Sequence, residues 1–330
     1  MVGSLSGADR SRLSGLTLEP RLASMGWKMA FLNEEIDEPD TIYHEGLNAS
    51  LADGVPLPFV MSVRPFEPDD GWMMDRRIRQ LQAEGKKIFD SSKIRMASDP
   101  SSGHPVALEP TSYFKGLVTN ELCLQEYQAC DGLSIDGTER AFPLSTIPRL
   151  ARSRMSNHIG VTSLAFDDDG CLCLCMNGSA SAIAAGKITS SAAGSIDMED
   201  VAGATSLTQA VAGAISRELA EETGLDRGVA IETRVIAFVR HLERGGKPEF
   251  IGVSRIRGRW ADIQNVVGET ERDFTEGHVI LDVRALGVDG ASLWMAENGE
   301  KASYALRSAW EFFVMEHSRQ NSILPGCIGI

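Results

Sequence analysis

The sequence of 330 residues predicts a protein of the α/β class, and two patterns in its second half indicate this. The stretch HIGVTSLAFDDDGCLCLCMN, which begins at His158, has the pattern of a strand, an acidic Asp-Gly turn and a second strand. A helical pattern follows at 206–223, and more strand patterns come after it. Alternating strands and helices of this kind are typical of an α/β domain.

Further elements are predicted on both sides of these patterns. In the second half we expect strands at 229–240 and 248–257, which are joined by a turn at Gly245-Gly246, another strand at 278–283, and a terminal helix at 303–318. The first half is predicted to be mixed, with a short helix at 21–33, a proline-interrupted strand at 55–63, an amphipathic helix at 72–85, and a helix or strand at 117–127.

The length of the chain exceeds that of one typical compact domain, so two domains are expected. We place the boundary near residue 150, where the polar stretch gives way to the hairpin pattern. Residues 1–150 then form an α+β domain of unknown role, in which residues 1–15 are expected to be disordered. Residues 151–330 form the domain that carries the chemistry.

The acidic composition limits the partners of the chain. A formal net charge of -14 disfavours nucleic acids and anionic membranes, but bound metal ions could reverse the local sign for a small phosphorylated substrate. We find no run of 18 apolar residues. Near its start the sequence also lacks the apolar stretch that a secretory signal needs. Cys171, Cys173 and Cys175 alternate as in a strand and are expected to be reduced, buried thiols. These observations together predict a cytoplasmic protein.

The segment from Arg217 to Leu225, RELAEETGL, carries the chemical signal. On a helix, Glu218, Glu221 and Glu222 are spaced i, i+3 and i+4, so they share one face. Like charges at this spacing repel, and a cation between them is therefore expected. Magnesium is commonly held by one or two carboxylates together with substrate phosphates, and the preceding Arg217 could brace one carboxylate. A solvated acidic face is the alternative interpretation.

This segment resembles the second half of the Nudix box, G-x5-E-x7-R-E-U-x-E-E-x-G-U, where U is aliphatic. Every fixed place from the arginine onward is matched, including Gly224. The resemblance covers about residues 155–320 and implies an α/β/α sandwich. It also implies that Glu218, Glu221 and Glu222 bind Mg2+, or Mn2+, with Arg217 as their brace. The implied activity is hydrolysis of the diphosphate bond in a nucleoside diphosphate linked to another moiety, such as a nucleotide sugar, ADP-ribose or a thiamine diphosphate-like compound.

The first half of the box is matched less well. Counted without gaps, Gly203 takes the place of the leading glycine, but the upstream glutamate is replaced by Gln209. One explanation is an insertion, in which a turn at Gly194 precedes the helix and Glu199 supplies the acid as a metal ligand, with Asp197 and Asp200 as alternatives. The other explanation is a capping box from Ser206 to Gln209. The two explanations are compatible.

Several further residues are candidates for catalysis and binding. The acidic loop at 268–277 offers Glu269 and Glu271 as general bases, with Glu222 and Glu221 as alternatives. Arg240 and Arg244 lie near the predicted Gly245-Gly246 turn, where they would contact substrate phosphates or form an exposed hairpin tip.

Two functions of different class follow from these observations. The first is a magnesium-dependent diphosphatase, and the second is a non-catalytic ligand-binding or regulatory module with the same fold. The complete set of Arg217 and three glutamates favours the enzyme, because a binding module would not need the whole metal set. The N-terminal part is expected to shape the substrate pocket or to mediate formation of a homodimer.

Overall fold

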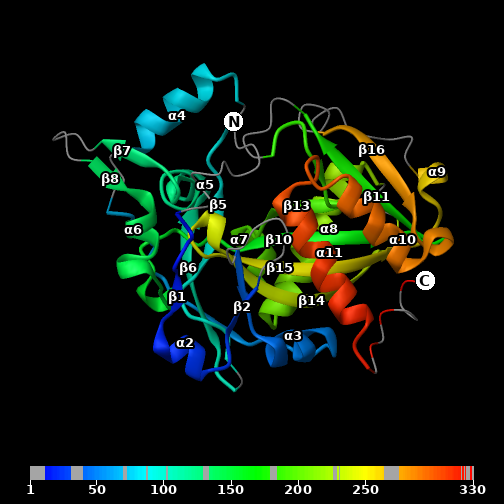
Figure 1. The fold of residues 1–330 in the computed structure, drawn as a ribbon, viewed down its shortest axis with the longest axis horizontal. Coiled ribbons are helices and arrows are strands. Elements are labelled where there is room, and N and C mark those ends of the chain that lie inside the picture. Colours follow the sequence, from blue (N-terminus) through cyan, green and yellow to red (C-terminus); the bar gives the residue numbers. More distant parts are fainter. Residues whose placement is uncertain are drawn as a thin grey trace.

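The computed structural model describes residues 12–30, 40–69, 73–86, 88–101, 103–128, 134–178, 184–225, 229, 231–263, 275–320, 322, 324 and 328. Helices and mixed sheets alternate along this chain, so the fold is of the α/β class that the sequence predicts (Figure 1). The first half forms many short elements, whereas the second half forms longer ones.

The elements before residue 150 are β1 (Thr17–Leu18), α2 (Pro20–Ser24), β2 (Lys28–Ala30), β3 (Thr41–Tyr43), α3 (Glu45–Ala52), β4 (Phe59–Met61), α4 (Met74–Ala83), β5 (Ser92–Met96), β6 (Val106–Ser112), α5 (Tyr113–Leu117), η2 (Asn120–Leu122), β7 (Glu126–Gln128), β8 (Ser134–Asp136), α6 (Gly137–Ala141), η3 (Pro143–Ser145) and β9 (Thr146–Ile147). The later elements are η4 (Leu150–Arg152), β10 (Gly160–Phe166), β11 (Cys171–Asn177), β12 (Ile188–Thr189), β13 (Ala192–Ser195), α7 (Met198–Val201), α8 (Leu207–Thr223), β14 (Ile231–His241), η5 (Leu242–Arg244), β15 (Lys247–Ile256), α9 (Trp260–Ile263), β16 (Thr275–Asp282), α10 (Val283–Glu297) and α11 (Tyr304–His317).

The predicted elements of the second half are confirmed. The helix at 206–223 is α8, the two long strands are β14 and β15, and the terminal helix is α11. Gly245 and Gly246 form the turn between these strands with φ of 64° and 74°, a conformation that glycine adopts without steric cost. In the first half, the helix predicted at 21–33 is wrong at 26–30, because the chain turns at Gly26 and forms β2, and residues 31–33 lie outside the described chain.

A nine-stranded sheet forms the centre of the molecule. Seven of its strands follow the order β12-β11-β10-β15-β14-β3-β2, and the other two, β13 and β16, pair with β10 and β11 outside this order. The predicted hairpin of β10 and β11 is paired only next to its turn, at Ala165–Cys173 and Phe166–Leu172. Beyond these pairs the two strands separate, so that β13 pairs with β10 and β16 pairs with β11. Because the two strands separate, β13 can pair with β10, and β13 also lies beside the glutamates of α8.

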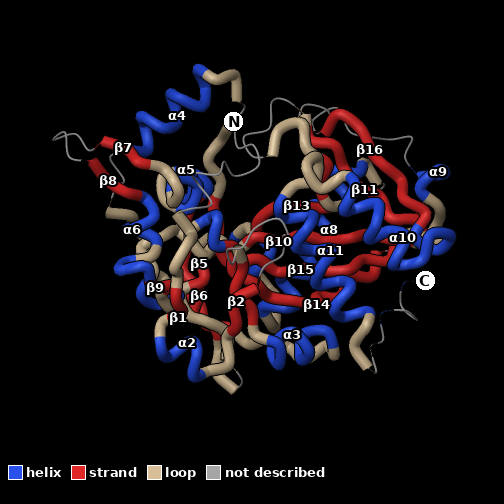
Figure 2. Tube along the Cα trace, viewed as in Figure 1, coloured by secondary structure: helices blue, strands red, loops and turns tan. Residues whose placement is uncertain are grey.

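Helices cover the two faces of this sheet (Figure 2). In β15 the side chain of Phe250 packs in one core cluster together with the apolar residues of α8, and the next residue, Ile251, packs in another cluster with those of α11. Successive side chains of a strand point to opposite faces, so α8 and α11 lie on opposite sides of the sheet.

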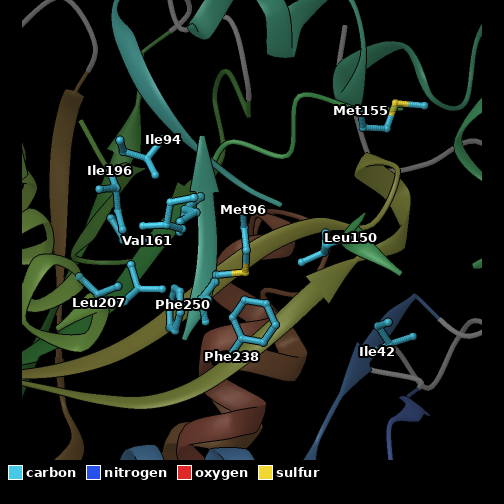
Figure 3. Packing of buried hydrophobic residues seen from close by; sticks show 14 of the residues in the cluster. Ile42, Ile94, Met96, Leu150, Met155, Val161, Ile196, Leu207, Phe238 and Phe250 are labelled. Atoms are coloured by element: carbon cyan, nitrogen blue, oxygen red, sulfur yellow. The ribbon is translucent and has the colours of Figure 1, made fainter. Parts of the chain in front are cut away.

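The sheet and its core include residues from both halves of the chain. Strand β3 pairs with β14, and β2 pairs with β3, so the N-terminal strands extend the sheet of the second half. Figure 3 shows Ile42, Ile94 and Met96 in the same apolar cluster as Phe238 and Phe250. The predicted boundary at residue 150 therefore does not coincide with a break in the sheet.

The disorder predicted for residues 1–15 is corrected in part. Residues 1–11 lie outside the described chain, but Leu13 is only 2% exposed. Arg12 donates hydrogen bonds to Glu126 and Asp136 at 2.8 and 3.1 Å. These contacts tie the described start of the chain to β7 and β8. No helix among the described residues is long and apolar enough to cross a membrane.

Candidate active site

Helix α8 carries the residues of the candidate site. Its first turn is capped by Ser206, whose Oγ accepts a hydrogen bond from the backbone N–H of Gln209 at 3.2 Å. It ends at Gly224, which has a φ of 68° and so provides the left-handed residue that commonly terminates a helix. The core-facing side buries Leu207, Val211, Ile215 and Leu219, and the glutamates lie on the partly exposed side.

Arg217 connects acidic side chains from α7 and α8. Its Nε and Nη2 donate to the two carboxylate oxygens of Asp200 at 3.2 and 2.9 Å. Its Nη1 donates to Glu218 at 2.9 Å and to Glu221 at 3.3 Å, and its Nη2 also donates to the backbone oxygen of Ser195 at 3.2 Å. A guanidinium held on so many sides is a rigid brace for the carboxylates around it.

Strand β13 supports the other side of the glutamates. The backbone N–H of Ala193 donates to Glu222 Oε2 at 3.1 Å. At the next residue, Gly194, a Cβ atom would overlap the carboxyl group of Glu218. Glu218 and Glu222 are one helical turn apart, so consecutive residues of β13 contact consecutive turns of α8. The glycine that the sequence places before the helix is therefore needed for the close approach of Glu218.

The environment changes the pKa values of the two central residues. Burial raises the pKa of Glu218, and the charges of Arg217 and Lys93 offset this only in part. Burial by itself would lower the pKa of Arg217, but its hydrogen bonds to Asp200 and the nearby carboxylates raise it above the ordinary value. Arg217 therefore stays charged, and Glu218 holds its proton more strongly than a solvated glutamate does.

The structure brings Asp200 to Arg217, which differs from the expectation that favours Glu199. Asp197 and Asp200 form a capping box at the start of α7, with Asp197 N donating to Asp200 Oδ2 at 2.8 Å. Residues three apart lie on the same side of a helical turn, and this side faces Arg217. Glu199 lies between them in the sequence and is exposed. The acid next to Arg217 of α8 is thus Asp200, one of the alternatives to Glu199 that the sequence offers.

Gln209 and Gly203 lie at the start of α8 and outside this cluster. The Gln209 carbonyl oxygen accepts hydrogen bonds from the N–H and hydroxyl of Thr205, both at 2.8 Å. The predicted cap is therefore present, although its backbone partner is Thr205 rather than Ser206. Gly203 is exposed with a φ of 85° in the turn between α7 and α8. Both residues shape the helix start instead of contacting the glutamates.

Arg240 and Arg244, for which the sequence predicts contacts with substrate phosphates, are held in ion pairs elsewhere. The Arg240 side chain is 0% exposed and pairs with Asp99 at 3.1 Å. Arg244 pairs with Glu121. Residues of the first half cover the turn of the β14–β15 hairpin, so the prediction of an exposed basic tip is corrected as well. Glu269 and Glu271, the predicted general bases, lie outside the described residues.

The donor chemistry of the cluster fits a hard divalent cation. Among the described residues, no three His, Cys, Asp or Glu side chains are arranged so that they could already hold a metal ion. Magnesium, however, usually takes only one or two carboxylates and fills its other positions with water and substrate phosphates. Within the described part of the chain, the side chains that the contacts of Arg217 and Lys93 connect, together with Glu222 beside Ala193, comprise five acids and two bases, which are Asp197, Asp200, Glu218, Glu221, Glu222, Lys93 and Arg217. When all are ionised, this group has three excess negative charges.

The sequence did not indicate Lys93 as part of the site. Lys93 lies in β5, and its ammonium pairs with Asp197. The two residues are far apart in the sequence, and no local motif surrounds Lys93. Only the pairing of segments from the two halves brings them together.

Comparisons with known proteins give no family assignment. No protein-family model matches the chain, and no curated protein matches it. Among solved structures, the DR0079 protein of Deinococcus radiodurans is 15% identical with a TM-score of 0.33, and the match covers 47% of this chain and 82% of that one. The MutT protein of Methanosarcina mazei Go1 is 20% identical with a TM-score of 0.31, and the match covers 49% of this chain and 95% of that one. At these TM-scores the likeness does not establish a shared fold.

Proposed function

We propose that the chain is a magnesium-dependent diphosphatase that cleaves a nucleoside diphosphate linked to another moiety. The observation that supports this is the group of three glutamates on α8, in which Arg217 braces Glu218 and Glu221 and the N–H of Ala193 holds Glu222. A structural ion-pair network would be expected to balance its charges, whereas this group keeps an excess of carboxylates. Such an excess suits a divalent cation and the phosphates that accompany it.

Glu218, Glu221 and Glu222 would hold magnesium, or manganese, in this proposal. When bound, the ion supplies neutralisation of the diphosphate oxygens and activation of water for attack on phosphorus. Arg217 keeps the carboxylate of Glu218 in a fixed orientation, and the N–H of Ala193 does the same for Glu222. Positioning and neutralisation of charge are the main contributions that phosphoryl transfer requires of a protein.

Glu222 is our choice for the general base. A water oxygen would attack one phosphorus while Glu222 accepts its proton, and the bond from that phosphorus to the bridging oxygen would break. The bridging oxygen would leave with the other phosphoryl group, so that two monophosphate products form. One oxygen of Glu222 is already fixed by Ala193 at 3.1 Å, which limits the orientations of the carboxylate. Glu269 and Glu271 are the competing candidates for this role.

The experiment is hydrolysis of a panel of nucleoside diphosphate compounds by the full chain with Mg2+ or Mn2+. Release of monophosphate would be followed by liquid chromatography. We expect Glu222→Gln to reduce the rate by a factor of about 100 or more, because it removes the proton acceptor. The matched control is Glu232→Gln, which neutralises an exposed glutamate of β14 that pairs with Arg257. A broad panel without turnover, together with tight binding of one compound, would favour the non-catalytic module instead.

A further inference from the structure

Strand β5 of the first half is joined to the candidate site by main-chain contacts. The N–H of Ile94 donates to the oxygen of Ile196 at 3.3 Å, and the N–H of Ile159 donates to the oxygen of Ile94 at 2.9 Å. Lys93 and Asp197 form an antiparallel bridge beside these bonds. Along its other side, β5 pairs with β6 over five residues. Lys93 is therefore held on a rigid strand next to the segment that connects β13 with α7.

The ammonium group of Lys93 and the guanidinium group of Arg217 lie nearest to different oxygens of the Asp197 carboxylate. The ammonium contacts Asp197 Oδ1, whereas Asp197 Oδ2 lies 3.6 Å from Arg217 Nη2. The Lys93 side chain is 11% exposed and that of Asp197 is 29% exposed, so the pair is only partly screened by water. A lysine so enclosed needs a counter-charge, and Asp197 is the carboxylate that provides it.

The same arrangement leaves Arg217 available to the other carboxylates. Its Nη2 donates to Asp200 at 2.9 Å and its Nη1 to Glu218 at 2.9 Å, both shorter than the 3.6 Å separation from Asp197. If Lys93 were absent, Asp197 would keep its charge but lose its nearer cation. The strongest remaining attraction would be to Arg217, which would have to turn away from Asp200 and Glu218.

We infer that Lys93 is a positioning residue of the site, which occupies Asp197 and so keeps Arg217 on Asp200 and Glu218. This inference rests on the proposed function for its catalytic consequence. It gives the first half of the chain a defined part in the reaction, because Lys93 adds a second cation to Arg217, the one basic residue that α7 and α8 provide. Besides its direct attraction for Glu218, Lys93 acts through Asp197 and Arg217, and it need not touch the substrate.

The test compares hydrolysis by the full chain carrying Lys93→Met, Lys93→Arg, Asp197→Asn and the double change Lys93→Met with Asp197→Asn. We expect K93M to lower the rate about tenfold, as changes behind metal ligands commonly do. K93R should retain most activity, since it keeps a cation beside Asp197. The double variant should recover activity relative to K93M, because the neutral asparagine that replaces Asp197 still caps α7 but no longer attracts Arg217. Lys28→Met, which breaks the exposed pair of Lys28 with Glu45, is the matched control.

A second measurement follows Arg217 itself and does not depend on turnover. The side-chain Nε–H signal of Arg217, assigned by its loss in Arg217→Lys, should shift in K93M and return in the double variant. Unchanged activity and an unchanged signal in K93M would overturn the inference, and so would a loss of activity that the double variant does not recover. If K93M does not fold, the hydrolysis rates and Arg217 signals of K93R and D197N are compared with those of the wild type instead. If the wild type neither hydrolyses the panel nor binds Mn2+, the proposed function fails, and the Arg217 signal still decides whether Lys93 positions it.

Discussion

A side chain at position 194 would occupy the space that the carboxyl group of Glu218 fills. Gly194→Ala should therefore displace Glu218 and lower the rate of the proposed diphosphate hydrolysis about tenfold or more. Gly213→Ala is the control, because Gly213 is an exposed glycine of α8 where a Cβ meets no atom within 4 Å. It should raise the free energy of unfolding by about 1 kcal/mol without changing the rate. Equal rates for G194A and the wild type would show that the place of Glu218 does not matter.

At the scale of single residues, the sequence predicted those relations that join residues close together in the chain. Glu218, Glu221 and Glu222 lie within five residues of one another, so their common face follows from the period of a helix. The segment before α8 contains several acids, and only the geometry of the α7 turn selects Asp200 over Glu199. Lys93 could not be found in this way, because its place beside Asp197 depends on a contact between distant segments.

At the scale of elements, the residues that start helix α8 have a different role from the residues of α8 that face the site. Gln209→Glu would restore the residue of the Nudix box, yet Gln209 is bonded to Thr205 at the start of the helix. We therefore expect this change to leave the hydrolysis rate unaltered and to stabilise the helix slightly, because a negative charge there interacts well with the helix dipole.

Asp200→Asn is the matching change inside the site. It weakens the two-point contact with Arg217 and should lower the rate about tenfold. The hydrolysis rates of Gln209→Glu and Asp200→Asn would both be measured on one substrate at saturating Mg2+. A gain of activity in Q209E would show instead that position 209 reaches the metal.

The elements that the sequence missed share a physical cause. Helix α10 contains Gly287, which has a φ of 69°, and Gly290, and glycine-rich segments do not have the pattern of a helix. Strands β2 and β3 have three residues each, too few to show an alternation of apolar and polar side chains. The separation of β10 from β11 also could not be foreseen, because it depends on competition from β13 and β16.

For the whole molecule, the buried histidines make stability depend on pH. Burial lowers the pKa of His241 to about 3, whereas an unfolded histidine titrates near 6.5. Between these values the unfolded chain binds a proton that the folded chain does not, so the free energy of unfolding falls as the pH falls below 6.5. From pH 6.5 to 5 the loss due to His241 should be about 2 kcal/mol.

His241→Gln should remove this part of the pH dependence. The amide can still bond to Ser308, the neighbour of His241 Nε2 at 3.3 Å, but it does not titrate. Denaturant unfolding at pH 5, 6, 7 and 8 would measure the free energy of unfolding for both proteins. The two curves should run parallel above pH 7 and diverge below 6.5. Curves that stay parallel down to pH 5 would contradict the assignment of this loss to His241.

The N-terminal strands of the central sheet also have a consequence for synthesis of the chain. Strand β3 pairs with β14, so the backbone of Tyr43 can pair only after Val239 has been synthesised, about 200 residues later. At about 5 to 20 residues per second, translation takes about 10 to 40 seconds to provide that partner. During this interval the ladder groups of β3 that face β14 lack their final partners, and so does the apolar side chain of Ile42. Unpaired strand edges of this kind are prone to aggregate, so a chaperone that shields β3 would act before α8 and its glutamates exist.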